Sequence, residues 1–292
     1  MKNQKFDIYA TITDQILDIM KDGVVPWHKP WLLSGRDRNL VTGKQYRGIN
    51  VFLLSCSSFG SPWWLTFNQA KAKGGQVRKG QKGTMIVFWK PLQIKEKNAV
   101  TGKDEKKKVF VLRYYTVFNL DQVDGIEAPP EPEKTEREPI ETAAKIIEEM
   151  QNPPAIKHGA TYDACYRPSS DEVNMPLLND FESSESYHSV LFHEVGHSTG
   201  HESRVSRPEG MKNIHFGSDK YSKEELIAEM TAAFLCGEAG ILQETIQQSA
   251  SYIESWSAKF KDDAKLVVCA AAAAQKATDY ILNRKFSESE TE

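Results

Sequence analysis

Three histidines and a glutamate lie within nine consecutive residues, 193 to 201, of a chain that has only seven histidines. The first five of these positions, His193 to His197, match the pattern H-E-x-x-H. On a helix, positions i and i+4 lie on one face about one turn apart, so both imidazoles can bind one zinc ion. Glu194 would then lie beside the water that the metal activates and could take its proton. The pattern predicts a metal-dependent hydrolytic site with Glu194 as the catalytic base.

A third protein ligand is needed, and the sequence offers no third histidine in a suitable place. One straight helix cannot bring His201 to the same ion as His193, because positions i and i+8 are about 12 Å apart along the axis. The longer pattern H-E-x-x-H-x-x-G-x-x-H would place its last histidine at position 203, which is Ser203. The third ligand must therefore come from another element.

Glu229 is the candidate that we derive from the residues around it. It lies in an amphipathic helix expected over 221–240, among apolar and small residues, so its side chain is expected to face the interior. A buried carboxylate requires a partner, and a metal is the obvious one. Glu224 and Glu225 lie in the first turn of that helix, where carboxylates are favourable without a metal. We predict zinc held by His193, His197 and Glu229, with Mn²⁺ or Co²⁺ able to occupy the same ligands.

An alternative remains open for this cluster. The histidines could form an ordinary polar helix face, and Glu229 could pair with an arginine. The residue that would stabilise a transition-state oxyanion also stays open, with four candidates: Tyr187, His201, His215 and Tyr221.

The elements around the cluster predict a mainly helical region with a small sheet. Helices are expected at PIETAAKIIEEM, near 187–200, and in one or two long stretches after residue 250, while ATYDACYRP and DEVNMP resemble short strands. We expect DEVNMP to be the edge strand beside the metal, where an extended substrate could pair with it.

The first 125 residues have the opposite charge from the rest of the chain. They hold 21 Lys and Arg against 10 Asp and Glu, a balance of +11, which leaves 16 against 30, or −14, for residues 126–292. From Arg38 to Lys95 there are ten basic residues and no Asp or Glu. A stretch of this kind must produce a positive surface, and the two halves are expected to have different partners.

Aromatic residues are interleaved with these cations, and the combination is typical of proteins that bind single-stranded nucleic acid through phosphate contacts and base stacking. No helix-turn-helix or zinc-finger pattern favours duplex instead. The simpler alternative is that the tryptophans are core residues and the lysines are only solvated. The residues that we expect to contact nucleic acid are Arg47, Trp63, Trp64, Lys71, Lys73, Arg78, Lys79 and Lys82.

Proline and glutamate dominate residues 125–141, which is the composition of an extended linker. We therefore expect an α+β protein with two domains, 1–125 and 140–292, joined by a linker at 126–139. The first domain should contain a helix from about Asp7 to Met20 and a hairpin formed by residues 92–96 and 108–120.

Composition also excludes several classes of protein. No apolar run approaches the roughly 20 residues of a membrane-spanning helix, and Asp7, Asp14 and Asp18 interrupt the start of the chain where a signal peptide would be apolar. The four cysteines are widely spaced, which argues against a disulfide framework or a thiolate zinc site. We expect a cytoplasmic protein without a membrane partner.

Several segments resemble the ArdC family of plasmid antirestriction proteins, in the same order along the chain. They are YRGIN, WWLTFNQAKAKGGQVRKGQKGTMIVFW, YTVFNLDQVDG, YHSVLFHEVGHSTGH and YSKEELIAEMTAAFLC. The resemblance implies an N-terminal domain that binds single-stranded DNA and a C-terminal zincin-like metallopeptidase domain. Carried over to this chain, it implies His193, His197 and Glu229 as metal ligands and Glu194 as the general base. The family role would be to protect incoming plasmid DNA from restriction during conjugation.

Three functions remain open from the sequence. The protein could be a shield that binds DNA, with a zinc domain that is structural or contacts a partner. It could be a DNA-dependent protease that cleaves restriction enzymes or other DNA-bound proteins. It could also be a peptidase whose basic domain binds an acidic protein, for which the sequence offers little support.

Overall fold

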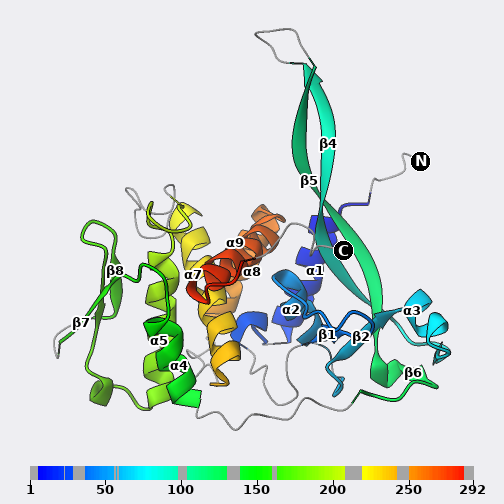
Figure 1. Ribbon diagram of the computed structural model, residues 1–292, viewed down its shortest axis with the longest axis horizontal. Coiled ribbons are helices and arrows are strands. Elements are labelled where there is room, and N and C mark those ends of the chain that lie inside the picture. Colours follow the sequence, from blue (N-terminus) through cyan, green and yellow to red (C-terminus); the bar gives the residue numbers. More distant parts are fainter. Residues whose placement is uncertain are drawn as a thin grey trace.

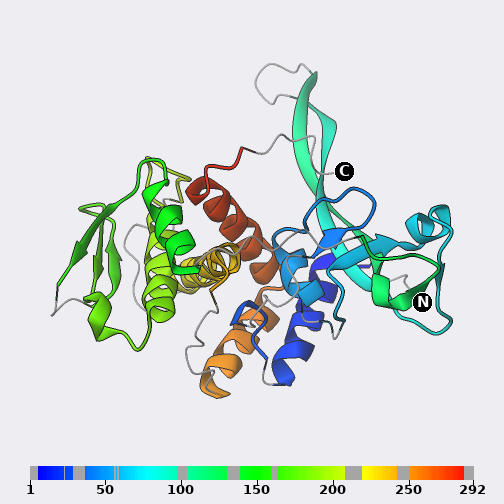
Figure 2. The same cartoon turned by 60° about the horizontal axis from the view of Figure 1, so that its bottom comes forward.

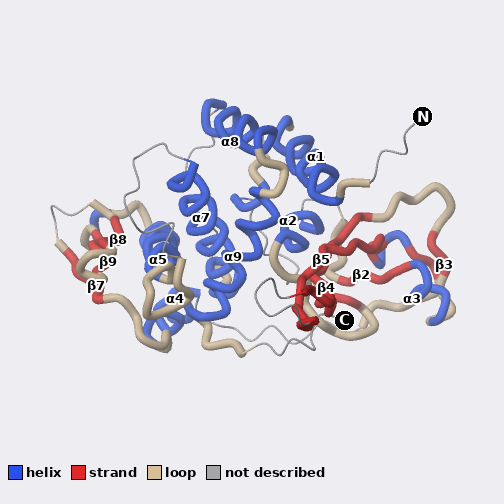
Figure 3. The backbone as a smooth tube through the Cα atoms, turned by 90° about the horizontal axis from the view of Figure 1, so that it is seen from above, coloured by secondary structure: helices blue, strands red, loops and turns tan. Residues whose placement is uncertain are grey.

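The two largest of the three described β-sheets lie at opposite ends of the molecule, with a layer of helices between them (Figure 1). The computed structural model describes residues 6–22, 24–28, 37–55, 57, 59–97, 104–129, 139–159, 163–207, 219–241 and 250–285. Viewed from above, the small sheet, the helices and the larger sheet follow one another across the molecule (Figure 3). This arrangement confirms the α+β fold class.

The N-terminal half begins with helix α1 (Ile8–Lys21), which starts where the Asp7 carboxylate accepts hydrogen bonds from the amides of Tyr9 and Ala10. Its apolar residues recur at helical spacing, and the predicted helix is confirmed. The elements that follow are η1 (Pro26–His28), β1 (Arg38–Asn39), α2 (Ile49–Ser55), β2 (Trp63–Thr66), α3 (Phe67–Ala72) and β3 (Gln76–Val77).

The larger sheet has the strand order β1-β2-β5-β4. Strands β4 (Thr84–Lys97) and β5 (Asp104–Asn119) pair antiparallel along their whole length, from Thr84 opposite Val117 to Lys97 opposite Asp104. The predicted hairpin is therefore confirmed, but its first strand begins at Thr84, well before the expected start at residue 92. Pro91 does not interrupt it, because β4 is an edge strand and a missing N–H is tolerated on the open side.

The far part of this hairpin projects away from the body, as Figures 1 and 2 show from two directions. At its base, η2 (Leu120–Gln122) leads to β6 (Val123–Asp124), which pairs with β3.

The C-terminal half consists of helices and a three-stranded sheet. The helices are α4 (Pro139–Glu148), η3 (Leu178–Asp180), α5 (Ser184–Ser198), α7 (Asp219–Ala239), α8 (Ala250–Asp262) and α9 (Leu266–Ile281). The strands are β7 (Ala155–His158), β8 (Cys165–Arg167) and β9 (Glu172–Met175), in the order β7-β9-β8. The expectation that DEVNMP forms the edge strand is wrong, because β9 lies in the centre. Val173 and Met175 are fully buried, as a central strand requires.

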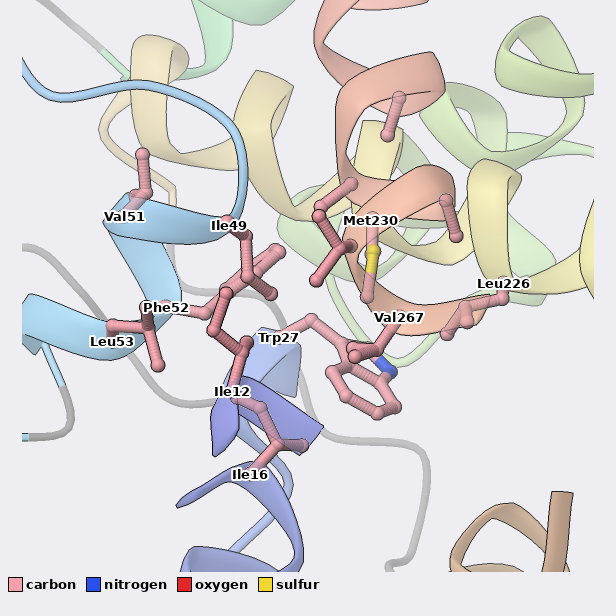
Figure 4. Close-up of a cluster of buried hydrophobic side chains, with 14 of the residues drawn as sticks. Ile12, Ile16, Trp27, Ile49, Val51, Phe52, Leu53, Leu226, Met230 and Val267 are labelled. Atoms are coloured by element: carbon pink, nitrogen blue, oxygen red, sulfur yellow. The ribbon is translucent and has the colours of Figure 1, made fainter. Parts of the chain in front are cut away.

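One hydrophobic cluster joins the two halves of the chain. Ile12 and Ile16 of α1, Trp27 of η1 and Phe52 of α2 belong to the same buried cluster as residues of α7, α8 and α9, and Figure 4 shows these side chains converging. The Phe52 ring stacks on that of Phe234 in α7, with centroids 5.1 Å apart. The N-terminal helices therefore complete the core of the C-terminal bundle.

Polar contacts cross the same junction. Arg47 forms an ion pair with Asp279 of α9, and the amide of Gly48 donates to the Gln275 side chain at 3.0 Å. The part of the linker at 130–138 lies outside the described residues, so the linker boundaries stay a prediction. No described helix is both long enough and apolar enough to span a membrane.

Candidate metal centre

Helices α5 and α7 pack side by side (Figure 1), and their close approach positions the cluster that the sequence indicated. Gly196 makes that approach possible. A Cβ at this position would lie 3.3 Å from Cβ of Thr231 and 3.4 Å from Cα of Ala228, both on α7. Small residues on the facing sides of the two helices thus bring the imidazoles of α5 within reach of carboxylates on α7.

His193, His197 and Glu225 offer ligand atoms that all lie within 4.8 Å of one another. The two Nε2 atoms are 3.1 Å apart. A Glu225 oxygen lies 3.5 Å from Nε2 of His193, and its other oxygen lies 3.5 Å from Nε2 of His197. Two nitrogens and a carboxylate therefore face one point between the helices.

These spacings fit a divalent metal. Ligand atoms about 2.0–2.1 Å from a tetrahedral zinc ion are separated from one another by about 3.3–3.4 Å. The three observed separations, 3.1, 3.5 and 3.5 Å, lie on both sides of that value. At 3.1 Å the two nitrogens can share one proton, and a metal ion between them would take the place of that proton. The residues present thus fit the metal that the sequence predicted.

Glu224 lies beside the Nδ1 atom of His197, the ring nitrogen that does not face the metal site. Its carboxylate lies 3.7 Å from Nδ1 of His197 and accepts hydrogen bonds from Nε and Nη2 of Arg207 at 3.0 and 2.5 Å. Arg207 also donates to Oγ1 of Thr199 and to the carbonyl of Gly196. A carboxylate beside the outer nitrogen of a metal-binding histidine fixes the direction of the ring.

The electrostatics of the cluster favour a positive charge at its centre. Burial acts to lower the pKa of His197, but the nearby carboxylates of Glu224 and Glu225 outweigh it and raise this pKa to about 10. Burial acts to raise the pKa of Glu225, yet the two histidines hold it well below its ordinary value. The carboxylates therefore stabilise a cation in the position where a metal would bind.

Glu194 extends from α5 toward the small sheet. Its Oε2 atom accepts a 2.8 Å hydrogen bond from the amide of Tyr166 in β8, and the residue is 8% exposed. Strand β8 is held in turn by Asp171, which accepts hydrogen bonds from the Tyr166 hydroxyl at 2.9 Å and from Arg204 at 2.7 and 2.8 Å. The predicted base is thus fixed between the histidine helix and the edge strand.

The structure places Glu229, the ligand predicted from the sequence, in a different environment. Its Oε2 atom accepts hydrogen bonds from Nε1 of Trp27 at 2.9 Å and from the Tyr252 hydroxyl. Burial raises the pKa of Glu229 despite these bonds. Glu225 precedes it by one helical turn, and this is the carboxylate that the structure brings to the two histidines. Glu229 as a metal ligand stays a prediction, and the geometry favours Glu225.

Exposure to solvent is a second criterion for comparing these two glutamates. The side chain of Glu225 is 25% exposed, and a ligand of a hydrolytic site must lie where water and substrate can reach the metal. No signal in the sequence alone separates the two, since both lie on the same face of α7.

The oxyanion candidates stay unassigned. The Tyr187 hydroxyl lies 2.9 Å from Nε2 of His158, and His201 contacts the Ser203 hydroxyl at 2.8 Å. His215 and the side chain of Tyr221 lie outside the described residues.

The residues predicted to contact nucleic acid divide into two groups. Lys71, Lys73, Arg78, Lys79 and Lys82 are exposed, in the segment from α3 to the start of β4. Trp63 and Trp64 are 7% and 0% exposed, and Nε1 of Trp64 donates to Asp37. Rings buried in this way present no face for a base. Arg47 forms an ion pair with Asp279. The exposed cations of the segment from α3 to β4 therefore form a group that does not include Arg47, Trp63 or Trp64.

Comparisons with known proteins match the two halves of the chain to different families. A family model described as the N-terminal domain of anti-restriction factor ArdC matches residues 6–118. A second model, described as a zincin-like metallopeptidase, matches residues 141–273. The chain therefore contains two domains of different families, as the sequence predicted.

The chain is similar to several known proteins along most of its length. A DNA primase TraC of Escherichia coli is 35% identical over 97% of this chain, which spans 28% of the length of that primase. An uncharacterized protein of Sinorhizobium fredii, y4eC, is 33% identical, and the match covers 94% of this chain and 91% of that protein.

Crystal structures of the antirestriction ArdC protein from R388 plasmid also match. The metal-free structure is 35% identical with a TM-score of 0.72, covering 96% of this chain and all of that one. The Mn(II)-bound structure is 34% identical with a TM-score of 0.73, covering 95% and 98%.

Proposed function

The chain belongs to the ArdC family of antirestriction proteins, and from that premise we propose that it binds single-stranded DNA and protects incoming plasmid DNA from restriction during conjugation. We propose further that its second domain is a metallopeptidase with zinc at the α5–α7 cluster. The observation that carries the second part is the spacing of the three ligand atoms, 3.1 to 3.5 Å.

The proposed ligands are His193, His197 and Glu225. Two imidazoles and a carboxylate are a ligand set of hydrolytic zinc enzymes, in which the fourth position is left to water and substrate. The relative from plasmid R388 was crystallised with Mn(II), and Mn²⁺ or Co²⁺ could occupy the same three ligands here. The native metal is accordingly proposed as zinc on ligand chemistry alone.

When bound, the metal would supply Lewis acidity that polarises a peptide carbonyl and makes water nucleophilic near neutral pH. Glu194 would accept the proton of that water and pass it to the leaving amine. The hydrogen bond from the Tyr166 amide keeps the Glu194 carboxylate in place. Glu224 and Arg207 would hold His197 in the rotamer that directs Nε2 to the metal.

Exposed cations support the DNA-binding part of the proposal. The segment 71–82 carries five Lys and Arg and no acidic residue, and its cations reach solvent at the base of the larger sheet. Phosphate contacts of this kind supply most of the affinity for nucleic acid without regard to sequence.

A second candidate function is favoured by the geometry of the metal centre. A well-formed base and ligand set would be unnecessary in a passive shield. The protein could therefore act as a DNA-dependent protease that cleaves restriction enzymes or other DNA-bound proteins. We favour the shield, because a protease that is active inside the cell without regulation would endanger its host.

Replacing Glu194 with Gln separates these functions. The two side chains are nearly isosteric, and the Gln carbonyl can still accept the Tyr166 amide, so the fold, metal content and DNA affinity should be retained. Only proton transfer should be lost. The measurement is plasmid survival in a restriction-proficient recipient, together with metal content and DNA affinity of the purified variant.

If the variant protects plasmid DNA as well as the wild type does, the shield is supported. Loss of protection in a folded, metal-loaded and DNA-binding variant would contradict the shield and identify a protease. A wild-type protein that binds no single-stranded DNA would contradict both versions of the proposal.

A further inference from the structure

The β4–β5 hairpin has one face that packs on the body and one that faces solvent. In an antiparallel pair, residues directly opposite each other lie on the same face. Val87 and Leu112 lie on the inner face, are buried, and belong to the core that α1 and α2 share with the C-terminal helices. Phe88 lies opposite Arg113, so both lie on the outer face.

Two aromatic rings stack on this outer face. Phe88 and Tyr115 have ring centroids 4.7 Å apart and planes only 7° from parallel, and Tyr115 is 55% exposed. Nearer the base, the same face is covered by a cluster that contains Trp64, Ile86 and Val117. The ring pair begins where that cover ends, so it is left open to solvent.

A groove of about 300 Å³ contains these rings and two cations. Its lining residues are Phe88, Lys90, Leu92, Arg113, Tyr114 and Tyr115. Lys90 and Arg113 are both exposed. The groove therefore combines flat apolar rings with positive charge on the hairpin.

The described part of this face carries positive charge and no negative charge. No Asp or Glu occurs at 84–93 or at 109–119, and the two cations of these segments, Lys90 and Arg113, lie opposite Val111 and Phe88 on the outer face. A partner with negative charge at regular intervals and flat rings between them would match both features. Single-stranded DNA has that chemistry, while duplex DNA keeps its base faces within the stack.

We propose that the outer face of the β4–β5 hairpin is a base-stacking site for single-stranded DNA, in which a base lies on the Phe88–Tyr115 pair and Lys90 and Arg113 contact the flanking phosphates. The inference rests on the DNA binding proposed above and adds its location. Sheet-surface aromatics bind unpaired bases in the same manner in other folds. The rings of Trp63 and Trp64 are buried and cannot stack on a base, whereas the rings in this groove can.

The test is the affinity of the full-length protein for a fluorescent oligothymidylate at moderate salt. Phe88→Leu combined with Tyr115→Leu keeps apolar side chains but removes both flat rings. One base–ring stack corresponds to about 5- to 150-fold in affinity, so we expect the dissociation constant to rise at least about tenfold. Phe88→Tyr combined with Tyr115→Phe keeps both rings and should bind as the wild type does.

Phe67→Leu provides a matched control. Phe67 is also 55% exposed and lies in the same domain, but it is on α3 outside the groove. It should leave the affinity within about twofold of the wild-type value. An equal loss in this control would contradict a stacking site on the hairpin, and thermal melting should show that all three variants are folded.

Photocrosslinking gives an independent measurement. An oligonucleotide that contains 5-iodouracil should crosslink to the peptide that contains Tyr115 in the wild-type protein. If the wild type binds DNA but the leucine variant binds equally well, or if crosslinks map elsewhere, the hairpin site is wrong while the proposed function stands. If the wild type binds no single-stranded DNA, both fail together.

Discussion

The metal centre and the outer face of the hairpin are built in opposite ways. At the metal centre, His197 of α5 lies between Glu224 and Glu225 of α7. Arg207, which follows α5, donates a hydrogen bond to Glu224. On the hairpin, Tyr115 is more than half exposed. A site for catalysis needs ligands that are already in place, whereas a site for a flexible polyanion needs accessible rings and cations.

Carboxylates that are buried or partly buried differ in the same way within the molecule. The pKa values of Glu224 and Glu225 are lowered by cationic partners in spite of burial. Burial raises those of Glu229 and Asp37, although Trp27 and Tyr252 donate hydrogen bonds to Glu229 and Trp64 donates one to Asp37. The cationic partners therefore outweigh burial at Glu224 and Glu225, whereas burial dominates at Glu229 and Asp37.

The largest expected effect is on metal binding and tests this contrast on one helix. Glu225→Ala should abolish stoichiometric zinc, because it removes one of three ligands. Glu229→Ala should retain zinc, because it removes a carboxylate held by Trp27 and Tyr252. Metal content after gel filtration measures both, and the reverse outcome would restore Glu229 as the ligand.

The next effect concerns the core that the two halves share. Trp27 is fully buried against α2 and α8, so Trp27→Ala should lower the free energy of unfolding by about 3–5 kcal/mol. Phe67→Ala, an exposed aromatic in the same domain, should change it by less than about 0.5 kcal/mol. Denaturant unfolding measures both values.

If Trp27→Ala lowered the stability of the N-terminal domain alone, the two domains would unfold independently, and the shared core would not couple their stabilities. A single transition that moves as a whole is the outcome that we expect.

A smaller effect should appear in the pH dependence of stability. The pKa of Asp37 is raised from 3.8 to about 6, mainly by burial. The folded state therefore binds a proton between about pH 4 and 6 that the unfolded state has released, and stability falls as pH rises through that window. A pKa difference of about two corresponds to at most about 3 kcal/mol.

Asp37→Asn isolates this contribution, because the amide oxygen can still accept the Trp64 hydrogen bond. The variant should be more stable than the wild type at about pH 8, and the difference should disappear near pH 4. A difference that is constant across the range would assign the effect to something other than ionisation.

The smallest effect concerns the exposed cations at the base of the hairpin. Replacing Lys71, Lys73, Lys79 and Lys82 with Ala should weaken single-strand binding with little effect on melting temperature. The slope of log K against log salt should become shallower by about 0.7 for each phosphate that the variant no longer neutralises. An unchanged slope would remove this segment from the binding surface.

The parts of the molecule that the sequence predicted well are those governed by local periodicity. Both helices of the metal centre, the hairpin and the two histidines follow from spacing along one element. The choice of Glu225 over Glu229 does not follow from local spacing. It depends on which turn of α7 lies opposite the histidines, and therefore on how α7 packs against α5 where Gly196 lies close to Ala228 and Thr231.

Composition predicted the charge of the N-terminal domain but not the direction in which its rings face. Trp63 and Trp64 occupy a short strand in the middle of the sheet, with a neighbouring strand on each side, and are therefore buried. Tyr115 lies on an arm with an uncovered face. Only the tertiary arrangement separates these two cases, because both segments are rich in aromatic residues.

The most direct test of the metal centre is anomalous X-ray diffraction at the zinc edge from crystals of the zinc-loaded protein. We expect one strong peak about 2.0–2.3 Å from Nε2 of His193, Nε2 of His197 and a carboxylate oxygen of Glu225, with Glu229 still bonded to Trp27 and Tyr252. A peak bonded to Glu229 in place of Glu225, or none between α5 and α7, would contradict it.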